Sequence, residues 1–402
     1  MERKPGVVIM GMGYIGLPTA ALIASKEIDV TGVDISQDVV DTINEGKIHI
    51  VEPDLEGLVH YGVKEGYLKA RTTPEKADVY IIAVPTPFKK DHKPDLTYVK
   101  NAIETLIPLL TKGALIIIES TSPAGTTEKV SRFIYDARPE LQNKIHIAYC
   151  PERVLPGNII YELEHNDRVI GGINEVSTER AVSFYKHFVK GFLHRADAKT
   201  AEMCKLVENS YRDVNIAFAN ELSIICDKAG IDVWKLISLA NKHPRVNILQ
   251  PGCGVGGHCI AVDPWFIVSE FPEEAKMIRT AREINNYKTE WVIEKIKNTA
   301  LKFELENKRK PRIACMGLAF KPNIDDLRES PALYITEKLI KEGFDVLPVE
   351  PNITTYDAFK LIPYKEAAEQ SDIIVFLVGH SVFKNLSLIN TKTNLDFCII
   401  LN

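Results

Sequence analysis

Residues 7–18 are VVIMGMGYIGLP, a short apolar run followed by glycines at Gly11, Gly13 and Gly16 with the spacing G-x-G-x-x-G. The apolar run predicts a buried strand, and the apolar periodicity of residues 17–25 predicts the helix that the glycines open. Glycines at these places permit a tight turn, the approach of a pyrophosphate to the backbone and close packing of helix on strand. The helix N-terminus then favours the phosphate charge. The stretch predicts a dinucleotide site at the start of an α/β domain.

An acidic residue follows the next predicted strand. The second predicted strand covers residues 29–33 and is followed by Asp34, twenty-one positions after Gly13. A carboxylate at this place accepts hydrogen bonds from an adenosine ribose and repels a 2′-phosphate. The spacing therefore favours NAD over NADP as the cofactor.

Strands and helices continue to alternate after this unit. Each predicted strand ends in a small polar or proline-rich loop, which is typical of a doubly wound parallel sheet whose carboxyl edge lines the ligand crevice. We expect Thr86, Thr121 and Glu152, which follow three of these strands, to face the cofactor, and a role as cap or turn residue stays open for each. The predicted strands are 78–84, 114–118 and 145–148, and the predicted helix is 96–110.

Composition excludes several classes of protein. The chain has 402 residues, enough for two or three domains, and a net charge of −5, so no large basic surface and no nucleic-acid partner are predicted. No apolar run approaches the length of a membrane span, and the N-terminus lacks the pattern of a signal peptide. Seven scattered cysteines fit a reducing compartment better than a disulfide framework. We expect a cytoplasmic protein that does not bind membranes.

A long helix without glycine or proline is predicted over residues 198–229. Lys205, Asn209 and Arg212 form a polar stripe on it, at positions i, i+4 and i+7. An amine, an amide and a guanidinium suit the binding of a hydroxyl and a phosphate. A solvated helix face is the alternative interpretation. Further helical segments are predicted at residues 231–240 and 273–302.

Between these helices lies QPGCGVGGHCIAVDP, residues 250–264. So many glycines let the backbone turn tightly and approach a ligand, with Cys259 at the edge of the loop and Asp263 four residues later. A thiol near a cation or a helix N-terminus can act as a nucleophile, and an inert cysteine in a buried turn is the alternative. Cys253, His258 and Cys259 match no zinc spacing, so no metal site is predicted.

The last part of the chain repeats the α/β pattern. Strands are predicted at 312–316, 345–349 and 373–378 and a helix at 330–341, after a charged linker at 306–311. This second Rossmann-like unit lacks the full glycine fingerprint, and its loop carries Lys321 and Arg328, which suits a different nucleotide. We predict three domains, namely an NAD-binding Rossmann domain at 1–196, a central helical domain with the cysteine loop at 197–304, and a Rossmann-like domain for a second nucleotide at 305–402.

Seven motifs occur along the chain in the order of one known family. They are GMGYIGLP, the PTP turn, ESTSPAGTTE, the PER element, the KxxEN helix, GVGGHC and GLAFKPNIDDLRES. The chain thereby resembles the UDP-glucose/UDP-mannuronate dehydrogenase family over nearly its whole length. GVGGHCIAVDPWF resembles the branch that acts on UDP-N-acetylhexosamines. It departs from the GFGGSCFPKD of the UDP-glucose branch, with His258 for the serine and Val262 for the lysine, while Asp263 is retained.

The resemblance implies oxidation of a sugar C6 alcohol to a carboxylate, with UDP-N-acetyl-D-mannosamine as the expected substrate, two NAD and one water consumed. Cys259 would trap the aldehyde as a thiohemiacetal, and a second hydride transfer would give a thioester that water hydrolyses. Lys205 and Asn209 are implied to stabilise developing charge. Asp263 and Glu152 both remain candidates for activating the hydrolytic water, and Thr121 is implied to orient water or the nicotinamide.

The family's contact residues carry over by motif. The resemblance implies that the central domain at 197–304 dimerises, which gives a homodimer, and that the domain at 305–402 binds the UDP-sugar. Arg245 is implied to reach the partner subunit's site. Cofactor contacts are expected from Gly11, Gly13, Tyr14, Ile15, Gly16, Asp34, Thr86, Thr121 and Arg328. Substrate contacts are expected from Arg153, Val154, Lys205, Asn209, Arg212, His243, Arg245, Gly256, Phe320 and Lys321.

Other functions stay open at this point. The same reaction on UDP-N-acetylglucosamine, UDP-N-acetylgalactosamine or UDP-glucose would need only a few changed hydrogen bonds. A hydroxyacid or hydroxyacyl dehydrogenase of the same architecture would release one NADH per turnover and would not need Cys259. A catalytically silent nucleotide-sugar binder is the third alternative. Members of the family usually continue past residues 399–402 with an Asp-Thr-Arg type element, so truncation of the sequence or a dispensable end is also open.

Overall fold

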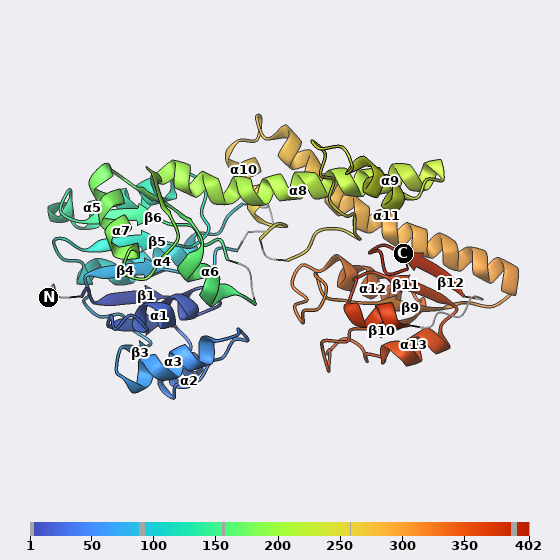
Figure 1. Ribbon diagram of the computed structural model, residues 1–402, viewed down its shortest axis with the longest axis horizontal. Coiled ribbons are helices and arrows are strands. Elements are labelled where there is room, and N and C mark those ends of the chain that lie inside the picture. Colours follow the sequence, from blue (N-terminus) through green and yellow to red (C-terminus); the bar gives the residue numbers. More distant parts are fainter. Residues whose placement is uncertain (1–3, 88–92, 155–156, 258, 387–391, 402) are drawn as a thin grey trace. The chain divides into compact units, whose positions relative to one another are not determined.

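The computed structural model describes residues 4–87, 93–154, 157–257, 259–386 and 392–401 (Figure 1). The chain forms two compact units, Met1–Glu208 and Asn209–Asn402, referred to below as unit 1 and unit 2. The boundary falls within one long helix, α8 (Ala198–Ala229), which matches the range predicted from the sequence. The predicted division into three domains stays a prediction.

Unit 1 is built on one twisted sheet whose described strands are ordered β3-β2-β1-β4-β5-β6-β7-β8. The first six pair in parallel, in the 3-2-1-4-5-6 order of dinucleotide-binding folds. β7 then pairs with β6 in the antiparallel sense. The strands are β1 (Val7–Met10), β2 (Val30–Val33), β3 (Leu68–Arg71), β4 (Val79–Ile82), β5 (Leu115–Ile118), β6 (His146–Tyr149), β7 (Arg168–Gly172) and β8 (Leu193–Asp197).

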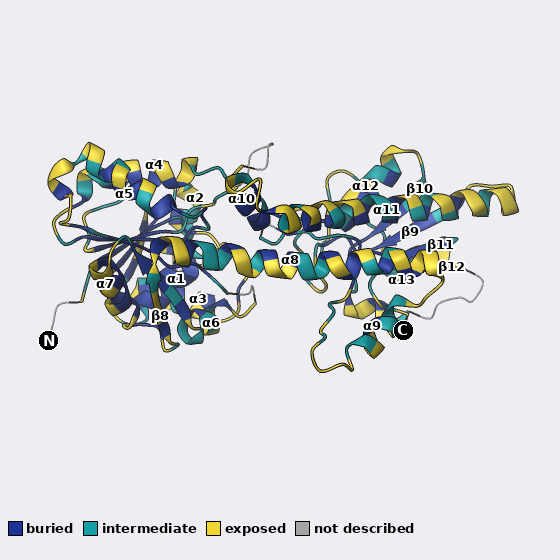
Figure 2. Cartoon of the chain, turned by 90° about the horizontal axis from the view of Figure 1, so that it is seen from above, coloured by how far each residue is buried: buried dark blue, intermediate teal, exposed yellow. Residues whose placement is uncertain are grey.

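Helices cover both faces of this sheet. Alternate residues of β1 enter opposite apolar layers: Val7 and Ile9 pack with α1, whereas Val8 and Met10 pack with α4. Such burial on both faces explains why β1, β4 and β5 are continuous apolar runs. Figure 2 shows the central strands in the dark colour of buried residues. The helices are α1 (Gly16–Ala24), α2 (Gln37–Asn44), α3 (Leu55–Lys64), α4 (Thr97–Leu106), α5 (Thr126–Ala137), α6 (Ile159–His165) and α7 (Glu175–Tyr185), with 3₁₀ turns at Ile107–Leu109 and Pro139–Leu141.

Unit 2 contains the rest of α8, three further helices of the middle region and a second parallel sheet, ordered β10-β9-β11-β12 in the described residues. α11 packs with α12 on one face of this sheet, and α13 covers the other face. The elements are α9 (Val233–Ala240), α10 (Asp263–Glu270), α11 (Lys276–Asn307), β9 (Arg312–Met316), α12 (Pro331–Lys341), β10 (Asp345–Val349), α13 (Tyr364–Gln370), β11 (Ile373–Phe376), a 3₁₀ turn at Ser381–Asn385 and β12 (Thr393–Asp396).

The α/β class expected from the sequence is confirmed, with one shift in the middle region. The helix predicted at 273–302 begins at Lys276 and continues to Asn307, so it takes up part of the expected linker. It ends where Lys308 adopts a left-handed conformation, three residues before Pro311. No helix among the described residues is both long and apolar enough to cross a bilayer.

Candidate active site

The glycine turn between β1 and α1 has the geometry that phosphate binding requires. Gly11 has φ 92°, and a Cβ there would lie 2.7 Å from the carbonyl oxygen of Ala83. A Cβ on Gly16 would lie 1.8 Å from the carbonyl oxygen of Gly11, so helix and turn pack without room for a side chain. A Cβ on Gly13 would meet none of the described atoms within 4 Å. This open backbone, with Tyr14 and Ile15 beside it at the start of α1, is where a pyrophosphate can approach.

Asp34 follows β2 directly and belongs to the same turn. Its two carboxylate oxygens accept backbone N–H groups, Oδ2 from Met12 at 3.0 Å and Oδ1 from Ser36 at 3.0 Å. Each carboxylate oxygen can accept a further hydrogen bond, so the side chain is oriented and still able to bind a ribose. These contacts fix the carboxylate beside the glycine turn, which is the place expected from the sequence.

The other expected cofactor residues lie at the carboxyl ends of neighbouring strands. Thr86 follows β4, Thr121 follows β5, and Glu152 follows β6. Because β1, β4, β5 and β6 are adjacent and parallel, the sheet brings these residues to the same edge as the glycine turn. Thr86 and Thr121 are half-buried, and Glu152 is buried.

The Glu152 side chain is held by the backbone N–H groups of the two residues that follow it and by a buried arginine. Its Oε1 accepts N–H groups from Arg153 at 2.5 Å and Val154 at 2.7 Å, and its Oε2 lies 3.6 Å from a guanidinium nitrogen of Arg168. Although burial opposes the charged guanidinium, Glu152 and other neighbours raise the pKa of Arg168 above its ordinary value. Arg168 thus keeps a positive charge next to the buried carboxylate of Glu152.

A second carboxyl group shares this arginine. Glu119 at the end of β5 is fully enclosed, and the Tyr185 hydroxyl donates to its Oε1 at 2.5 Å. Burial raises the pKa of Glu119 to about 7, and the charge of Glu152 adds to the rise while Arg168 opposes it. Glu119, Arg168 and Tyr185 were not singled out from the sequence. Glu119 lies within the quoted ESTSPAGTTE motif, whereas Arg168 and Tyr185 come from β7 and α7, which sequence spacing does not connect to it.

The polar residues of α8 are distributed over both units. Lys205 lies in unit 1 and is half-buried, while Asn209 and Arg212 lie in unit 2. The Asn209 amide donates to Oδ2 of Asp263 at 2.5 Å, so two of the expected site residues contact each other. Asp263 is buried and is the first residue of α10, where a carboxylate is stabilised by the helix dipole.

Cys259 lies in a tight turn immediately before α10. Its carbonyl oxygen accepts the backbone N–H of Val262 at 3.0 Å and of Asp263 at 2.8 Å, and the residue is half-buried. Cys253 in the same loop differs, because its thiol donates to the carbonyl oxygen of Leu377 at 3.4 Å and burial raises its pKa to about 12. Of these two thiols, Cys259 is the accessible one. No group of three or more His, Cys, Asp or Glu among the described residues could hold a metal ion, and His258 lies outside the described residues.

The glycines before Cys259 pack against the loop after β9. A Cβ on Gly256 would lie 2.8 Å from Cβ of Phe320, and one on Gly257, which has φ 81°, would lie 2.9 Å from the ring of Phe320. The backbone N–H of Gly257 also donates to the carbonyl oxygen of Arg328 at 3.1 Å. The structure thus brings together Gly256 and Phe320, which were expected to bind the same substrate.

Most of the remaining expected contact residues are exposed or ion-paired. His243, Arg245 and Lys321 are exposed in unit 2. Arg328 makes a bidentate ion pair with Asp326, and Arg153 in unit 1 makes one with Glu208. Arg212 is exposed and Val154 half-buried.

Three family models match the chain in sequence order. The NAD binding domain of the UDP-glucose/GDP-mannose dehydrogenase family matches residues 6–189, its central domain matches residues 199–287, and its UDP binding domain matches residues 314–402. The NAD-binding model covers the glycine turn, Asp34 and the strand ends described above. The UDP-binding model covers the loop that carries Phe320.

Named relatives are similar to nearly the full chain. UDP-N-acetyl-D-mannosamine dehydrogenase of Campylobacter jejuni is 55% identical over 400 residues, covering 95% of this chain and 97% of the relative. NDP-N-acetyl-D-galactosaminuronic acid dehydrogenase of Ralstonia nicotianae is 52% identical over 393 residues, covering 94% and 92%. The solved structure of UDP-D-ManNAc dehydrogenase from Pyrococcus horikoshii superposes with a TM-score of 0.88 at 38% identity, covering 98% of this chain and 96% of that one.

Proposed function

The chain belongs to the UDP-glucose/GDP-mannose dehydrogenase family, and from this we propose that it oxidises the C6 alcohol of UDP-N-acetyl-D-mannosamine to the carboxylate. The overall reaction consumes two NAD and one water. The observation that carries the proposal is Cys259 in its glycine loop, because a four-electron oxidation needs a covalent group that holds the aldehyde between two hydride transfers.

NAD, when bound, accepts one hydride from C6 in each half of the reaction. The fit of unit 1 to this cofactor rests on the open backbone at Gly13 and on the oriented carboxylate of Asp34. We assign Gly11, Gly13, Tyr14, Ile15 and Gly16 to the pyrophosphate turn. Asp34 binds the ribose, and Thr86 and Thr121 line the nicotinamide side. Arg328 remains assigned to the cofactor from the family motif alone.

Cys259 forms and breaks the covalent bond. After the first hydride leaves, the sulfur bonds to C6 of the aldehyde and the former carbonyl oxygen takes a proton, which gives a thiohemiacetal. Loss of the second hydride and of the hydroxyl proton gives a thioester, and attack by water breaks the C–S bond to release the carboxylate and the thiol. The difference in burial between Cys259 and Cys253 supports this choice of nucleophile.

Residues on α8 and α10 are assigned to stabilising the oxyanion and to assisting the attack of water. We assign Lys205 and Asn209 to stabilising the developing oxyanion, because an ammonium and an amide both donate hydrogen bonds to it. Asp263, buried and bonded to Asn209, supports water attack on the thioester, and Glu152 is the second candidate for that role. Arg153, Val154, Arg212, His243, Arg245, Gly256, Phe320 and Lys321 are assigned to the nucleotide sugar.

A second copy of the chain completes the proposed enzyme. On α8, Tyr211, Phe218 and Ile225 are spaced by seven residues, so they lie along one stripe of the helix, and they are 74%, 55% and 56% exposed. An apolar stripe on a long helix supports a helix-to-helix dimer contact. The substitution Phe218→Glu should shift sedimentation from dimer to monomer, and an unchanged sedimentation coefficient would remove this stripe from the interface.

The decisive experiment counts NADH formed per mole of limiting UDP-N-acetyl-D-mannosamine. We expect two NADH per substrate with the native chain and none beyond a first hydride transfer with Cys259→Ala. Cys226→Ala serves as the matched control, because Cys226 is buried on α8 and has no assigned role. One NADH per substrate, or full turnover by Cys259→Ala, would contradict the covalent scheme.

UDP-N-acetylgalactosamine is the second candidate substrate, favoured by the 52% identity to the Ralstonia nicotianae protein. The same assay with UDP-N-acetylgalactosamine, UDP-N-acetylglucosamine and UDP-glucose separates them. Two NADH from another sugar and none from the mannosamine nucleotide would keep the mechanism and change the substrate.

A further inference from the structure

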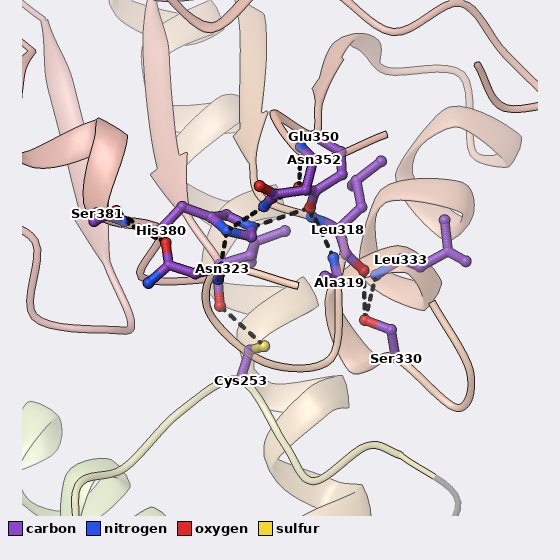
Figure 3. Close-up of polar contacts among 11 residues, drawn as sticks. Cys253, Leu318, Ala319, Asn323, Ser330, Leu333, Glu350, Asn352, His380 and Ser381 are labelled. Carbon is purple, nitrogen blue, oxygen red and sulfur yellow. Dashed lines mark hydrogen bonds and ion pairs between the residues drawn. The ribbon is translucent and has the colours of Figure 1, made fainter. Parts of the chain in front are cut away.

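The second sheet carries an acid where the first carries Asp34, but the structure uses it differently. Glu350 follows β10, the strand beside β9, as Asp34 follows β2 beside β1. Its Oε2 accepts the backbone N–H groups of Leu318 at 2.8 Å and Ala319 at 2.9 Å and lies 3.0 Å from Nε2 of His380 (Figure 3). Its Oε1 accepts both N–H groups of Asn352, from the backbone and from the amide. This carboxylate is buried and fully engaged within the chain.

His380 connects Glu350 to the loop after β9, which carries Phe320 and Lys321. It follows β11, on the other side of β9 from Glu350, and its side chain is 1% exposed. Its Nδ1 receives the backbone N–H of Asn323 at 3.0 Å and the amide of Asn352 at 3.0 Å, so this nitrogen carries no proton. The proton is therefore on Nε2, which donates to Glu350. Burial raises the pKa of Glu350, but the bonds from His380, Asn352 and Leu318 outweigh it and the pKa is lowered overall.

Asn323, whose backbone N–H donates to His380, lies in the loop that carries Phe320 and Lys321. Asn323 has φ 61°, a left-handed conformation, and its side-chain oxygen accepts both the backbone N–H and the hydroxyl of Ser381. Figure 3 shows Asn323, His380 and Ser381 facing one another at this turn. The loop after β9 and the segment after β11 are thus joined through three hydrogen bonds at a single residue.

The same two segments anchor the glycine loop before Cys259. The thiol of Cys253 donates to Leu377, three residues before His380. The N–H of Gly257 donates to Arg328 in the loop after β9, and Phe320 of that loop closes over Gly256 and Gly257. The loop is therefore held at Cys253 by the β11 end and at Gly257 by the β9 loop. His380 lies in the segment after β11, and its side chain accepts a hydrogen bond from Asn323 in the loop after β9.

We propose that His380 is a positioning residue for the proposed reaction. It sets the spacing between the loop after β9, which carries Phe320, and the segment after β11, and these two segments together hold the loop of Cys259. It contacts neither substrate nor cofactor in this role. The inference rests on the proposed function for its kinetic test, whereas its effect on the Cys259 thiol can be measured without any substrate.

Three substitutions separate the two hydrogen-bonding sides of the ring. His380→Asn retains an acceptor near Nδ1 for the N–H of Asn323, His380→Gln retains a donor near Nε2 for Glu350, and His380→Leu removes both. His194→Gln is the matched control, because His194 is exposed in unit 1 and pairs with Asp167 at the surface.

The substrate-free readout is the rate at which iodoacetamide alkylates Cys259 relative to Cys204, a half-buried cysteine of unit 1, measured by peptide mass spectrometry in the same sample. The kinetic readout is KM for UDP-N-acetyl-D-mannosamine and for NAD. In His380→Leu we expect the alkylation ratio to change at least threefold and KM for the sugar nucleotide to rise about tenfold. KM for NAD should stay within twofold, because the NAD residues other than Arg328 lie in unit 1.

In His380→Asn the alkylation ratio and KM for the sugar nucleotide should return most of the way to the native values, and in His380→Gln they should return less. The reason is that the hydrogen bond to Asn323 joins the two segments. A folded His380→Leu protein with an unchanged alkylation ratio would overturn the proposal, and so would a parallel rise of both KM values. If His380→Leu fails to fold, equal alkylation ratios in the Asn and Gln variants would overturn it. Should the native chain oxidise none of the UDP-sugars, the proposed function fails while the alkylation ratios still decide the role of His380.

Discussion

The substitution Glu119→Gln isolates the buried carboxyl group behind Glu152. The amide has the shape of the protonated acid and keeps an oxygen for the Tyr185 hydroxyl, which lies 2.5 Å from Oε1. It removes only the ability to ionise. Arg168 retains Glu152 as its carboxylate partner, at 3.6 Å. A difference between the two proteins that depends on pH therefore reports the ionisation of Glu119.

The expected magnitude follows from the proton that Glu119 holds. Its pKa is about 7 in the folded protein and 4.5 ordinarily. Between these values the folded state keeps a proton that the unfolded chain releases, so the contribution of Glu119 to stability is largest below pH 4.5 and is lost as the pH rises to about 7. The difference of about 2.5 pKa units, at 1.36 kcal/mol each, corresponds to roughly 3 kcal/mol. The native chain loses this amount between about pH 4.5 and 7, and Glu119→Gln does not.

Hydrogen exchange of the peptide covering β5 measures this locally, as the free energy of opening at pH 5 and at pH 8. We compare the free energy of opening of Glu119→Gln with that of the native chain at each pH. This difference should be larger at pH 8 than at pH 5 by about 2 kcal/mol, in favour of Glu119→Gln. Glu128→Gln is the control, because Glu128 lies on the surface of α5 and pairs with the exposed Lys199. Equal pH dependence in all three proteins would refute the assignment of a raised pKa to Glu119.

Three further predictions test the two units separately. Asp34→Asn should lower the preference for NAD over NADP, as the ratio of kcat/KM values, at least tenfold, since it removes the charge that repels a 2′-phosphate; an unchanged ratio would count against ribose binding by Asp34. Gly257→Ala places a Cβ 2.9 Å from the ring of Phe320 at φ 81°, so kcat should fall at least tenfold, while Gly252→Ala, whose Cβ would lie 3.8 Å from its nearest neighbour, should stay within twofold; equal losses would contradict the close approach. Burial lowers the pKa of Lys288 from 10.5 to about 7, so stability rises with pH across that range. Lys288→Met should thus stabilise unit 2, followed by urea unfolding with tryptophan fluorescence, by about 2 kcal/mol more at pH 7 than at pH 9, and a gain independent of pH would exclude this cause.

Much of the fold could be predicted because its central strands are buried on both faces. Val79–Ile82 is a continuous apolar run, and so is Arg312–Met316 after its first residue; both lie within the predicted ranges. β3, β7, β8 and β12 were not predicted, and β3 and β8 show why. Leu68–Arg71 alternates buried and exposed residues over only four positions, and Leu193–Asp197 is largely exposed, so neither has the apolar signal of a central strand.

The site divides in the same way. The glycine turn and Asp34 follow from local spacing, because a single βαβ unit positions all of them. The buried pairs Glu119 with Tyr185 and Glu350 with His380 are separated by 66 and 30 residues, and sheet order rather than spacing brings them together. A sequence without an alignment gives no signal for such a pair beyond an acid placed after an apolar strand.

The two sheets show that the same topological position can serve opposite purposes. Asp34 takes one N–H on each oxygen and stays half-buried, so it keeps acceptor capacity for a ligand. Glu350 takes three donors on one oxygen and two on the other, from Leu318, Ala319, His380 and Asn352, and it is buried. A carboxylate saturated in this way cannot bind a ribose without breaking internal hydrogen bonds, each of which stabilises a buried charge. The acid of the second sheet therefore shapes the loop after β9, and a nucleotide bound at that loop would have to be recognised by other groups of the loop.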